Sequence, residues 1–284
     1  MTGKHRLFRV AWWICNLLLV ATIISTVYCA VWEFSVREYL DGFSDAVVPD
    51  FIPDVDKVRY ILRWMGNGPF RPVTPDPSVL SDRDPQTTLN YKQLLAVCGS
   101  ATNAFLNLAR SSDLATRRLL LLDGDNHVKH VVAEVLIDHR WVVVDPAFRV
   151  MLTDEAGHPL TRMELRDPTV FWQATHNIPH YPPENNYNNF AHVRLTRIPV
   201  VGLAMKRLLD RMWPRWDEKI DWTLLLERKS FFFLFIAFCE SVMFLLLRFV
   251  LAWYADRRIR VPRFRLRSHL HRAGAALLFS PEIK

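Results

Sequence analysis

Three residues that together could activate a thiol occur in order along the middle of the chain. Cys98 is followed by His130 in a strand-like run and by Asp145 in the next such run. A thiol nucleophile needs a base that removes its proton and a carboxylate that orients the base. The types and order of these residues therefore predict a Cys-His-Asp site.

Cys98 is the one cysteine of the sequence that lies outside two long apolar segments. A region with a single thiol cannot close an internal disulfide, so packing or reactivity must account for Cys98. The sequence that starts at Cys98, CGSATNAFLNLAR, has one apolar stripe and predicts a buried helix over 98–110. At the start of a helix the dipole favours the thiolate and lowers the pKa of a thiol. The stripe consists of Ala101, Phe105, Leu108 and Ala109.

Two strands must bring His130 and Asp145 together. Residues 128–138 alternate, with valine, alanine and isoleucine on one face and His130 and Glu134 on the other. The next strand is expected over 141–147. A loop of only residues 139 and 140 would pair His130 with Arg149, about 13 Å beyond Asp145. We therefore expect a wider loop that starts near Leu136, or a β-bulge.

Two apolar segments, 10–31 and 231–254, predict transmembrane helices. The first has no charged residue, and each is long enough to cross a hydrocarbon core of about 30 Å. A cleaved signal peptide is the alternative for the first segment, but Val27 and Cys29 would make a poor cleavage site.

The net charge of +7 belongs to the two ends of the chain. Residues 1–32 carry three basic residues and no acidic one, and residues 230–284 carry nine basic and three acidic residues. Residues 33–229 carry 24 basic and 26 acidic residues. Basic flanks of apolar segments indicate two cytoplasmic termini, with the middle region on the opposite, periplasmic side of a cell inner membrane. The middle lacks the basic excess of a nucleic-acid-binding domain, so no nucleic acid partner is expected.

Glu240 lies near the middle of the second apolar segment. A carboxylate at this depth usually faces a protein partner or stays protonated. One interpretation is a helix–helix contact, with Asn16 of the first segment or with another membrane protein. The other is a neutral, tolerated side chain.

The chain divides into a cytoplasmic N-terminus (1–9), a first span (10–31), a lead-in (33–90), a core (91–195), a connector (196–229), a second span (231–254) and a basic cytoplasmic tail (255–284). The lead-in has a helical pattern over 56–65 and a proline-rich loop over 66–85. The loop 179–192 either covers a substrate cleft or lies on the surface. The connector has an amphipathic helix over 198–212, and then Trp213, Trp216 and Trp222, which we expect at a membrane interface.

The stretch from Thr88 to Ala147 resembles the transglutaminase-like core shared by transglutaminases and many bacterial proteins. The segment AVCGSATNAFLNLAR is similar to the nucleophile helix of that family, and HVVAEVLIDHRWVVVDP is similar to its His-bearing and Asp-bearing strands. The resemblance implies an α+β fold in which the Cys98 helix packs on an antiparallel sheet, here between two transmembrane helices. Ser100 and Thr102 stand where many relatives carry an acidic and an aromatic residue, which argues against the calcium-dependent periplasmic protease branch.

The resemblance also implies the chemistry, which is attack on an amide bond of a protein or peptide. Cys98 would attack the carbonyl, His130 would shuttle the proton and Asp145 would orient the imidazole, with backbone amides and Gln93 as candidate oxyanion donors. Water or an amine would release the acyl group.

We expect no cofactor and no metal, because His127 and His130 would point to opposite faces of a strand. The alternative to an enzyme is a catalytically silent binding module within an envelope or exopolysaccharide assembly complex.

Overall fold

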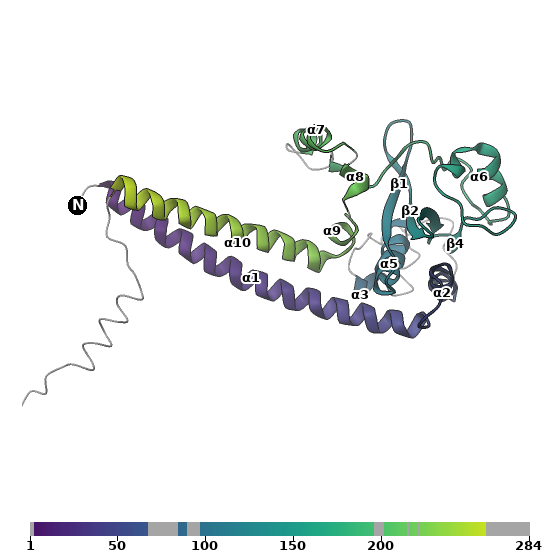
Figure 1. Ribbon diagram of the computed structural model, residues 1–284, viewed down its shortest axis with the longest axis horizontal. Coiled ribbons are helices and arrows are strands. Elements are labelled where there is room, and N and C mark those ends of the chain that lie inside the picture. Colours follow the sequence, from purple (N-terminus) through teal and green to yellow (C-terminus); the bar gives the residue numbers. More distant parts are fainter. Residues whose placement is uncertain are drawn as a thin grey trace, which may run out of the picture. The chain divides into compact units, whose positions relative to one another are not determined.

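The computed structural model describes residues 3–67, 85–89, 97–195, 202–214, 216–220 and 222–259 (Figure 1). The chain forms two units. One comprises Met1–Val27 and Ile236–Lys284, and the other comprises Tyr28–Phe235. The first unit holds most of two long helices, and the second holds a sheet with its covering helices.

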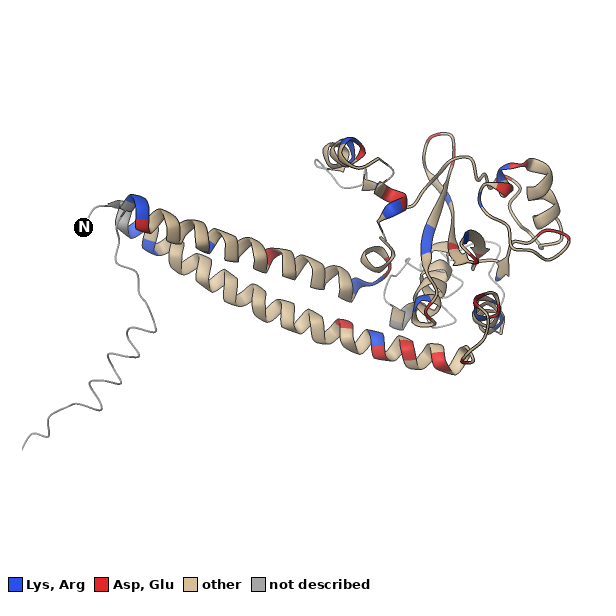
Figure 2. Ribbon diagram, viewed as in Figure 1, with Lys and Arg blue, Asp and Glu red and all other residues tan. Residues whose placement is uncertain are grey.

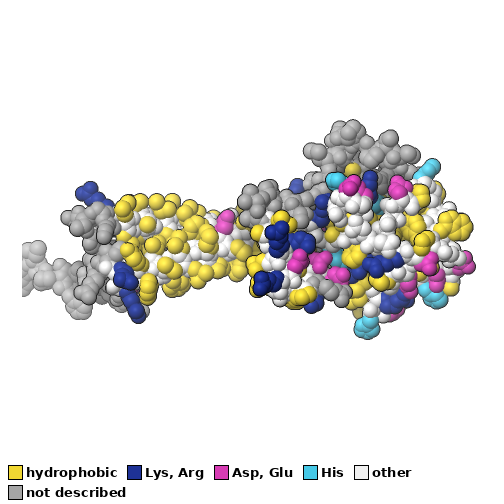
Figure 3. Space-filling view, turned by 90° about the horizontal axis from the view of Figure 1, so that it is seen from above, with side chains coloured by type: hydrophobic (Ala, Val, Ile, Leu, Met, Phe, Trp, Pro, Cys, Tyr) yellow, Lys and Arg dark blue, Asp and Glu magenta, His cyan; other side chains and the backbone are white. Residues whose placement is uncertain are grey.

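The first unit pairs the N-terminal part of α1 (Gly3–Val47) with most of α10 (Lys229–Tyr254), which continues as the π-helix η3 (Ala255–Ile259). The Oγ atoms of Thr26 and Ser241 lie 3.1 Å apart across this pair. Apolar side chains cover the visible surface of the two helices, and charged residues lie mainly near their ends (Figures 2 and 3).

Both helices are long and apolar enough to cross a membrane. The most apolar windows within Arg6–Val47 and Lys229–Arg258 are only 22% and 11% buried, whereas a core helix of a soluble protein would be mostly buried. Exposed apolar surface of this extent supports membrane association.

The second unit is built on a five-stranded antiparallel sheet in the order β4-β3-β2-β1-β5. The strands are β1 (Thr116–Leu122), β2 (Val128–Ile137), β3 (Arg140–Asp145), β4 (Val150–Met151) and β5 (Phe190–Ala191). With the helices around it, this sheet confirms the α+β class expected from the sequence.

Hydrophobic clusters cover both faces of the sheet. One joins α2 (Asp54–Gly66), α5 (Cys98–Ser111) and the end of α1 to residues of β2 and β3 such as Ala133 and Val144. The other joins residues such as Val132 and Val143 to Tyr187 and α6 (Pro168–Thr175). The shorter helices are α3 (Pro85–Thr88), η1 (Glu164–Arg166), α7 (Gly202–Met212), α8 (Trp216–Lys219) and α9 (Thr223–Glu227).

Helix α5 is buried on every side. The sequence predicts one apolar stripe, but the polar residues Ser100, Thr102 and Asn103 are as deeply buried as their apolar neighbours. The reason is tertiary: β1 and β2 contact α5, and so do α2, α3 and α9. A helix enclosed in this way must satisfy its polar side chains with internal partners.

A buried polar network supplies partners for Asn103 and Asn107 and joins α5 to Glu33 of α1 and to the residues where α10 begins. Arg228 donates to Glu33 at 2.8 Å and to the amide oxygen of Asn107 on α5 at 2.9 Å. Ser230 donates to the second oxygen of Glu33 at 2.6 Å. One turn before Asn107, Asn103 donates to the Glu227 carboxylate at 2.9 Å. The helix that carries Cys98 is therefore held by the residues where α10 begins.

The turn between β2 and β3 is shorter than the sequence suggests. Ile137 pairs with Arg140, so the loop consists of Asp138 and His139 alone. Both residues have positive φ, 48° and 62°, as a two-residue type I′ hairpin requires. The expected wider loop from Leu136 is therefore wrong. The observed turn of residues 138 and 139 lies one residue before a turn of residues 139 and 140, and this shift brings Asp145 two residues closer to His130 in the pairing of the strands.

The connector also differs from expectation at one tryptophan. Trp216 is 3% exposed, donates from Nε1 to Asp210 at 2.9 Å and packs edge-on against Trp222. It therefore lies inside the protein and not at a membrane interface. Trp213 is exposed, as an interfacial residue would be. The first four residues of the expected 198–212 helix lie outside the described residues, as does most of the proline-rich loop.

Candidate active site

The sheet brings His130 and Asp145 into direct contact. Nε2 of His130 lies 2.7 Å from Oδ2 of Asp145, and both side chains are almost completely buried. The β2–β3 register places Asp145 opposite Val132, two residues from His130 and on the same face of the sheet. The short turn is therefore sufficient to assemble this pair.

Cys98 completes the group at the start of α5. Its side chain interacts with His130 through a hydrogen bond and through charge. Because Nε2 of the ring faces Asp145, the nitrogen left for the sulfur is Nδ1. Cys98 is partly buried and packs against the clusters beneath α5 and β1. The three residues that the sequence selects are thus contiguous in space.

The surroundings of His130 favour its charged form. Burial of the ring lowers its pKa, but the negative charge and hydrogen bond of Asp145, together with the Cys98 interaction, outweigh burial and raise the pKa to about 10. A cationic imidazole at neutral pH is the partner that stabilises a thiolate.

Asp145 is fixed by several donors. Its Oδ1 accepts from the backbone amides of Ala147 at 3.1 Å and Phe148 at 3.3 Å, an arrangement typical of an Asp that opens a turn. The Tyr181 hydroxyl forms a further hydrogen bond to the carboxylate. These contacts leave Oδ2 aimed at His130.

Sequence reasoning missed Tyr181 and Tyr187. Both lie in the 179–192 loop, which the sequence leaves open as a cover or a surface loop, and both are buried with their hydroxyl oxygens 3.3 Å apart. Burial and the nearby Asp145 charge raise the pKa of each phenol, so both stay neutral donors. The Phe148 ring contacts both Tyr181 and His130. Two tyrosines in an Asn-rich loop give no periodicity from which this burial could be predicted.

A side-chain bond fastens α5 to the strand that carries His130. Thr102 donates from Oγ1 to the carbonyl of Val131 at 2.9 Å. The pairing of β1 with β2 becomes irregular at Leu121 and Leu122, next to the Leu121–His130 pair. Such irregularities commonly re-aim a side chain beside an active site. The bond to Val131 gives Thr102, which departs from the family pattern, a structural role of its own here.

Candidate oxyanion donors lie at the start of α5. The first amides of a helix have no acceptor within it, which makes them candidates. The amides of Ser100 and Ala101 already bond to the carbonyl of Val97, so the candidates precede them in the first turn. Gln93, the side-chain donor expected from the sequence, lies outside the described residues. Among the residues that are described, no three His, Cys, Asp or Glu side chains are arranged to hold a metal ion.

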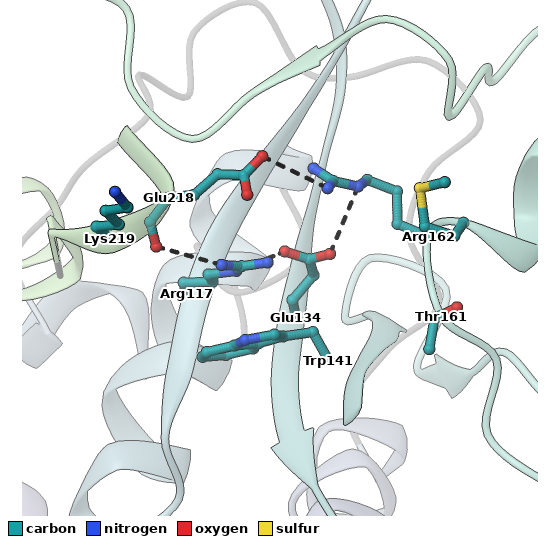
Figure 4. Close-up of a pocket in the computed structure, with 8 residues that line it drawn as sticks. Arg117, Glu134, Trp141, Thr161, Arg162, Glu218 and Lys219 are labelled. Atoms are coloured by element: carbon teal, nitrogen blue, oxygen red, sulfur yellow. Dashed lines mark hydrogen bonds and ion pairs between the residues drawn. The ribbon is translucent and has the colours of Figure 1, made fainter. Parts of the chain in front are cut away.

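Glu134 belongs to a separate charged cluster farther along β2. Its carboxylate is 1% exposed and lies 2.6 Å from Nε of Arg117, which stacks on the Trp141 ring (Figure 4). Arg162 points toward the same carboxylate and toward Glu218, at 4.0 and 3.7 Å. These residues line an open pocket of about 500 Å³. The ion pairs tie β1, β2 and the segment after β4 together.

A comparison with known protein families gives one match. Residues 44–146 match the family model of the transglutaminase-like superfamily. This region is a transglutaminase-like domain. The matched region contains Cys98, His130 and Asp145 and ends one residue after Asp145. Searches of curated proteins and of solved structures find no match.

The transglutaminase-like superfamily includes cysteine peptidases and acyltransferases. The structure adds segments outside the match to the domain, because β4, β5 and the 179–192 loop complete the sheet and its second core. Two candidate membrane-spanning helices flank the domain.

Proposed function

We propose that the chain is a membrane-anchored cysteine enzyme that attacks amide bonds outside the cytoplasm. Cys98 is the nucleophile, His130 is the general base and acid, and Asp145 orients the imidazole. The observation that carries the proposal is the buried 2.7 Å contact between His130 and Asp145, together with the hydrogen bond between Cys98 and the same imidazole ring. The substrate is a protein or peptide.

The reaction proceeds through a thioester. The Cys98 thiolate adds to the amide carbonyl, and the amides at the start of α5 stabilise the oxyanion. His130, cationic before the attack, gives its proton to the leaving nitrogen as the C–N bond breaks. It then takes a proton from water or from an acceptor amine, which attacks the thioester and regenerates Cys98. Water as acceptor gives a peptidase or amidase, and an amine gives acyl transfer.

Both termini lie in the cytoplasm and the catalytic domain lies in the periplasm, so the chain crosses a cell inner membrane twice. The support is the basic residues beside each apolar segment, among them Lys4 and Arg9 before residues 10–31 and a run of arginines after residues 231–254. The exposed side chain of Glu240 favours a second membrane protein as a partner. The side-chain amide of Asn16 donates to the carbonyl of Trp12, one turn earlier on α1.

Alkylation of Cys98 tests the assembled site. In full-length protein with Cys15, Cys29 and Cys239 replaced, we expect iodoacetamide to alkylate Cys98 rapidly well below pH 8. The His130→Ala variant should react only near pH 8.5, as a free thiol does. Identical pH profiles for the two proteins would contradict the thiolate–imidazolium pair.

Acylation then tests the chemistry. p-Nitrophenyl acetate should transfer one acetyl group to Cys98, detectable by intact mass, and hydrolysis or added amine should remove it with turnover. Cys98→Ser should show neither step. Failure of acylation in a protein whose Cys98 alkylates normally would favour the silent binding module.

A further inference from the structure

Helix α7 turns a polar side toward the domain. Asp210 accepts hydrogen bonds from the buried Trp216 at 2.9 Å and from Lys206 at 2.8 Å. Lys206 and Asp210 line a cavity together with Asn189 and Phe190 of the domain. Gly202, on the same side at 100° per residue, is buried.

The opposite side of α7 is apolar and exposed. Met205, Leu208 and Met212 follow one another at i, i+3 and i+7, and their exposed fractions are 37%, 56% and 72%. A surface helix of a soluble protein has the reverse arrangement, with its apolar stripe toward the core. The outward stripe of α7 therefore requires another apolar environment.

The charges beside the stripe indicate what that environment is. Arg207 and Arg211 are exposed and lie one turn apart next to Leu208, and Asp210 is already engaged by Trp216 and Lys206. An apolar stripe edged by arginines is typical of helices that lie in a membrane interface. Trp213, exposed at the end of the helix, has the character of an interfacial anchor.

Covalent connection keeps α7 near a membrane. Sixteen residues separate Met212 from Lys229, where α10 begins (229 − 212 − 1). Even fully extended, this stretch spans no more than roughly 55 Å. Since α10 is a candidate membrane-spanning helix, α7 stays within reach of the bilayer surface at all times.

We infer that α7 docks on the surface of the membrane that anchors the chain. Met205, Leu208 and Met212 enter the boundary between headgroups and acyl chains, and Arg207 and Arg211 contact anionic headgroups. This inference rests on the membrane anchoring in the proposed function and is independent of the Cys98 chemistry.

Lipid-dependent quenching tests the inference on the full chain in nanodiscs. The single cysteine of Leu208→Cys, in a chain with all four native cysteines replaced, carries the environment-sensitive fluorophore NBD. In discs containing phosphatidylglycerol we expect a blue-shifted emission that doxyl-labelled lipids quench. Arg207→Gln with Arg211→Gln, or discs of phosphatidylcholine alone, should lower the quenching several-fold.

Two further labels make the outcomes distinct. NBD at Glu155→Cys, an exposed position in the turn between Asp154 and His158, should stay water-like and unquenched. NBD at native Cys239 on α10 should be quenched in every disc. Quenching at Cys239 without quenching at Leu208 would overturn the α7 inference alone, and no quenching at Cys239 would overturn the membrane anchoring. A blue shift at Leu208 without lipid quenching would mean that protein covers the helix, and equal quenching at Glu155 would mean that the contact is non-specific. Either result would also overturn the inference.

Discussion

His130 and Asp145 meet diagonally across β2 and β3, and not as a directly opposed pair. Ala133 lies opposite Val144, which sets Asp145 level with Val132 and two residues from His130 along the sheet. Diagonal neighbours on one face remain within reach of longer side chains. A slip of one residue would send the two side chains to opposite faces, so the two-residue turn at Asp138 and His139 fixes the site.

Replacing Asp145 by Asn should slow the reaction of Cys98 at pH 7 by about 10-fold or more, because the charge that holds His130 cationic is removed. The measurement is the iodoacetamide alkylation rate in protein whose other cysteines are replaced. Asp154→Asn is the matched control, since Asp154 also contacts a histidine, His158 at 3.2 Å, but on the exposed surface. An equal effect of the two substitutions would contradict a specific role for Asp145.

The stability of the domain should depend on pH through His130. Its folded pKa of about 10 exceeds the ordinary value of 6.5, so the stabilisation is fully present below pH 6.5 and is lost as pH rises toward 10. In a Cys98→Ser background, which isolates the His130–Asp145 pair, the sulfur no longer helps to raise the pKa, so the window is narrower and we expect a loss of about 2 kcal/mol. Apparent melting temperatures in detergent would measure it. The Cys98→Ser/His130→Gln protein should lack this slope, and parallel curves would refute the assignment.

Tyr181→Phe should destabilise the domain by about 1–2 kcal/mol, because the Asp145 carboxylate loses a buried donor and the Tyr187 hydroxyl loses a neighbour. Chemical denaturation of the full chain would measure the change. The same substitution at Tyr60, which is 37% exposed, should be nearly neutral. A neutral result at both positions would show that the Tyr181 hydroxyl contributes nothing to the fold.

Breaking the buried pair of Glu33 and Arg228 should cost about 3–5 kcal/mol, since Arg228→Met leaves a buried carboxylate without its cation. Glu33→Gln combined with Arg228→Met should cost less than the sum of the two single changes.

The exposed pair of Asp56 and Arg59 is the control, and its loss should cost at most about 0.5 kcal/mol. Additive effects at Glu33 and Arg228, measured by denaturation, would mean that the two side chains do not interact.

The sequence predicts the elements of the site well because each is locally encoded. The alternation around His130 marks β2, and the stripe after Cys98 marks α5, whose observed start is at Cys98 itself. The helical spacing from Val58 to Met65 marks α2, and its apolar residues Val58, Ile61, Leu62 and Met65 are all buried. Local periodicity suffices for such segments because the regular spacing of their apolar residues is visible within the segment itself.

The sequence does not predict what depends on contacts between distant segments. Tyr181 and Trp216 lie in stretches without periodicity, and their burial follows from packing against Phe148 and Trp222. The sequence predicts a wider turn than the observed two-residue one, because Asp-His lacks the Asn-Gly signature that normally identifies a type I′ hairpin. Asn107 is an ordinary polar position on a helix until Arg228, 121 residues later, is seen to bind it.

The family match begins at residue 44, but the fold of the domain begins earlier in α1. Val36 and Leu40 are buried in the core beneath the sheet, and Glu33 lies in the network with Arg228. A protease that cut between Glu33 and Leu40 would remove part of that core. Such a cut would inactivate the domain and would not release it in active form. The activity proposed for this chain therefore cannot be freed from the first membrane helix by proteolysis at this point.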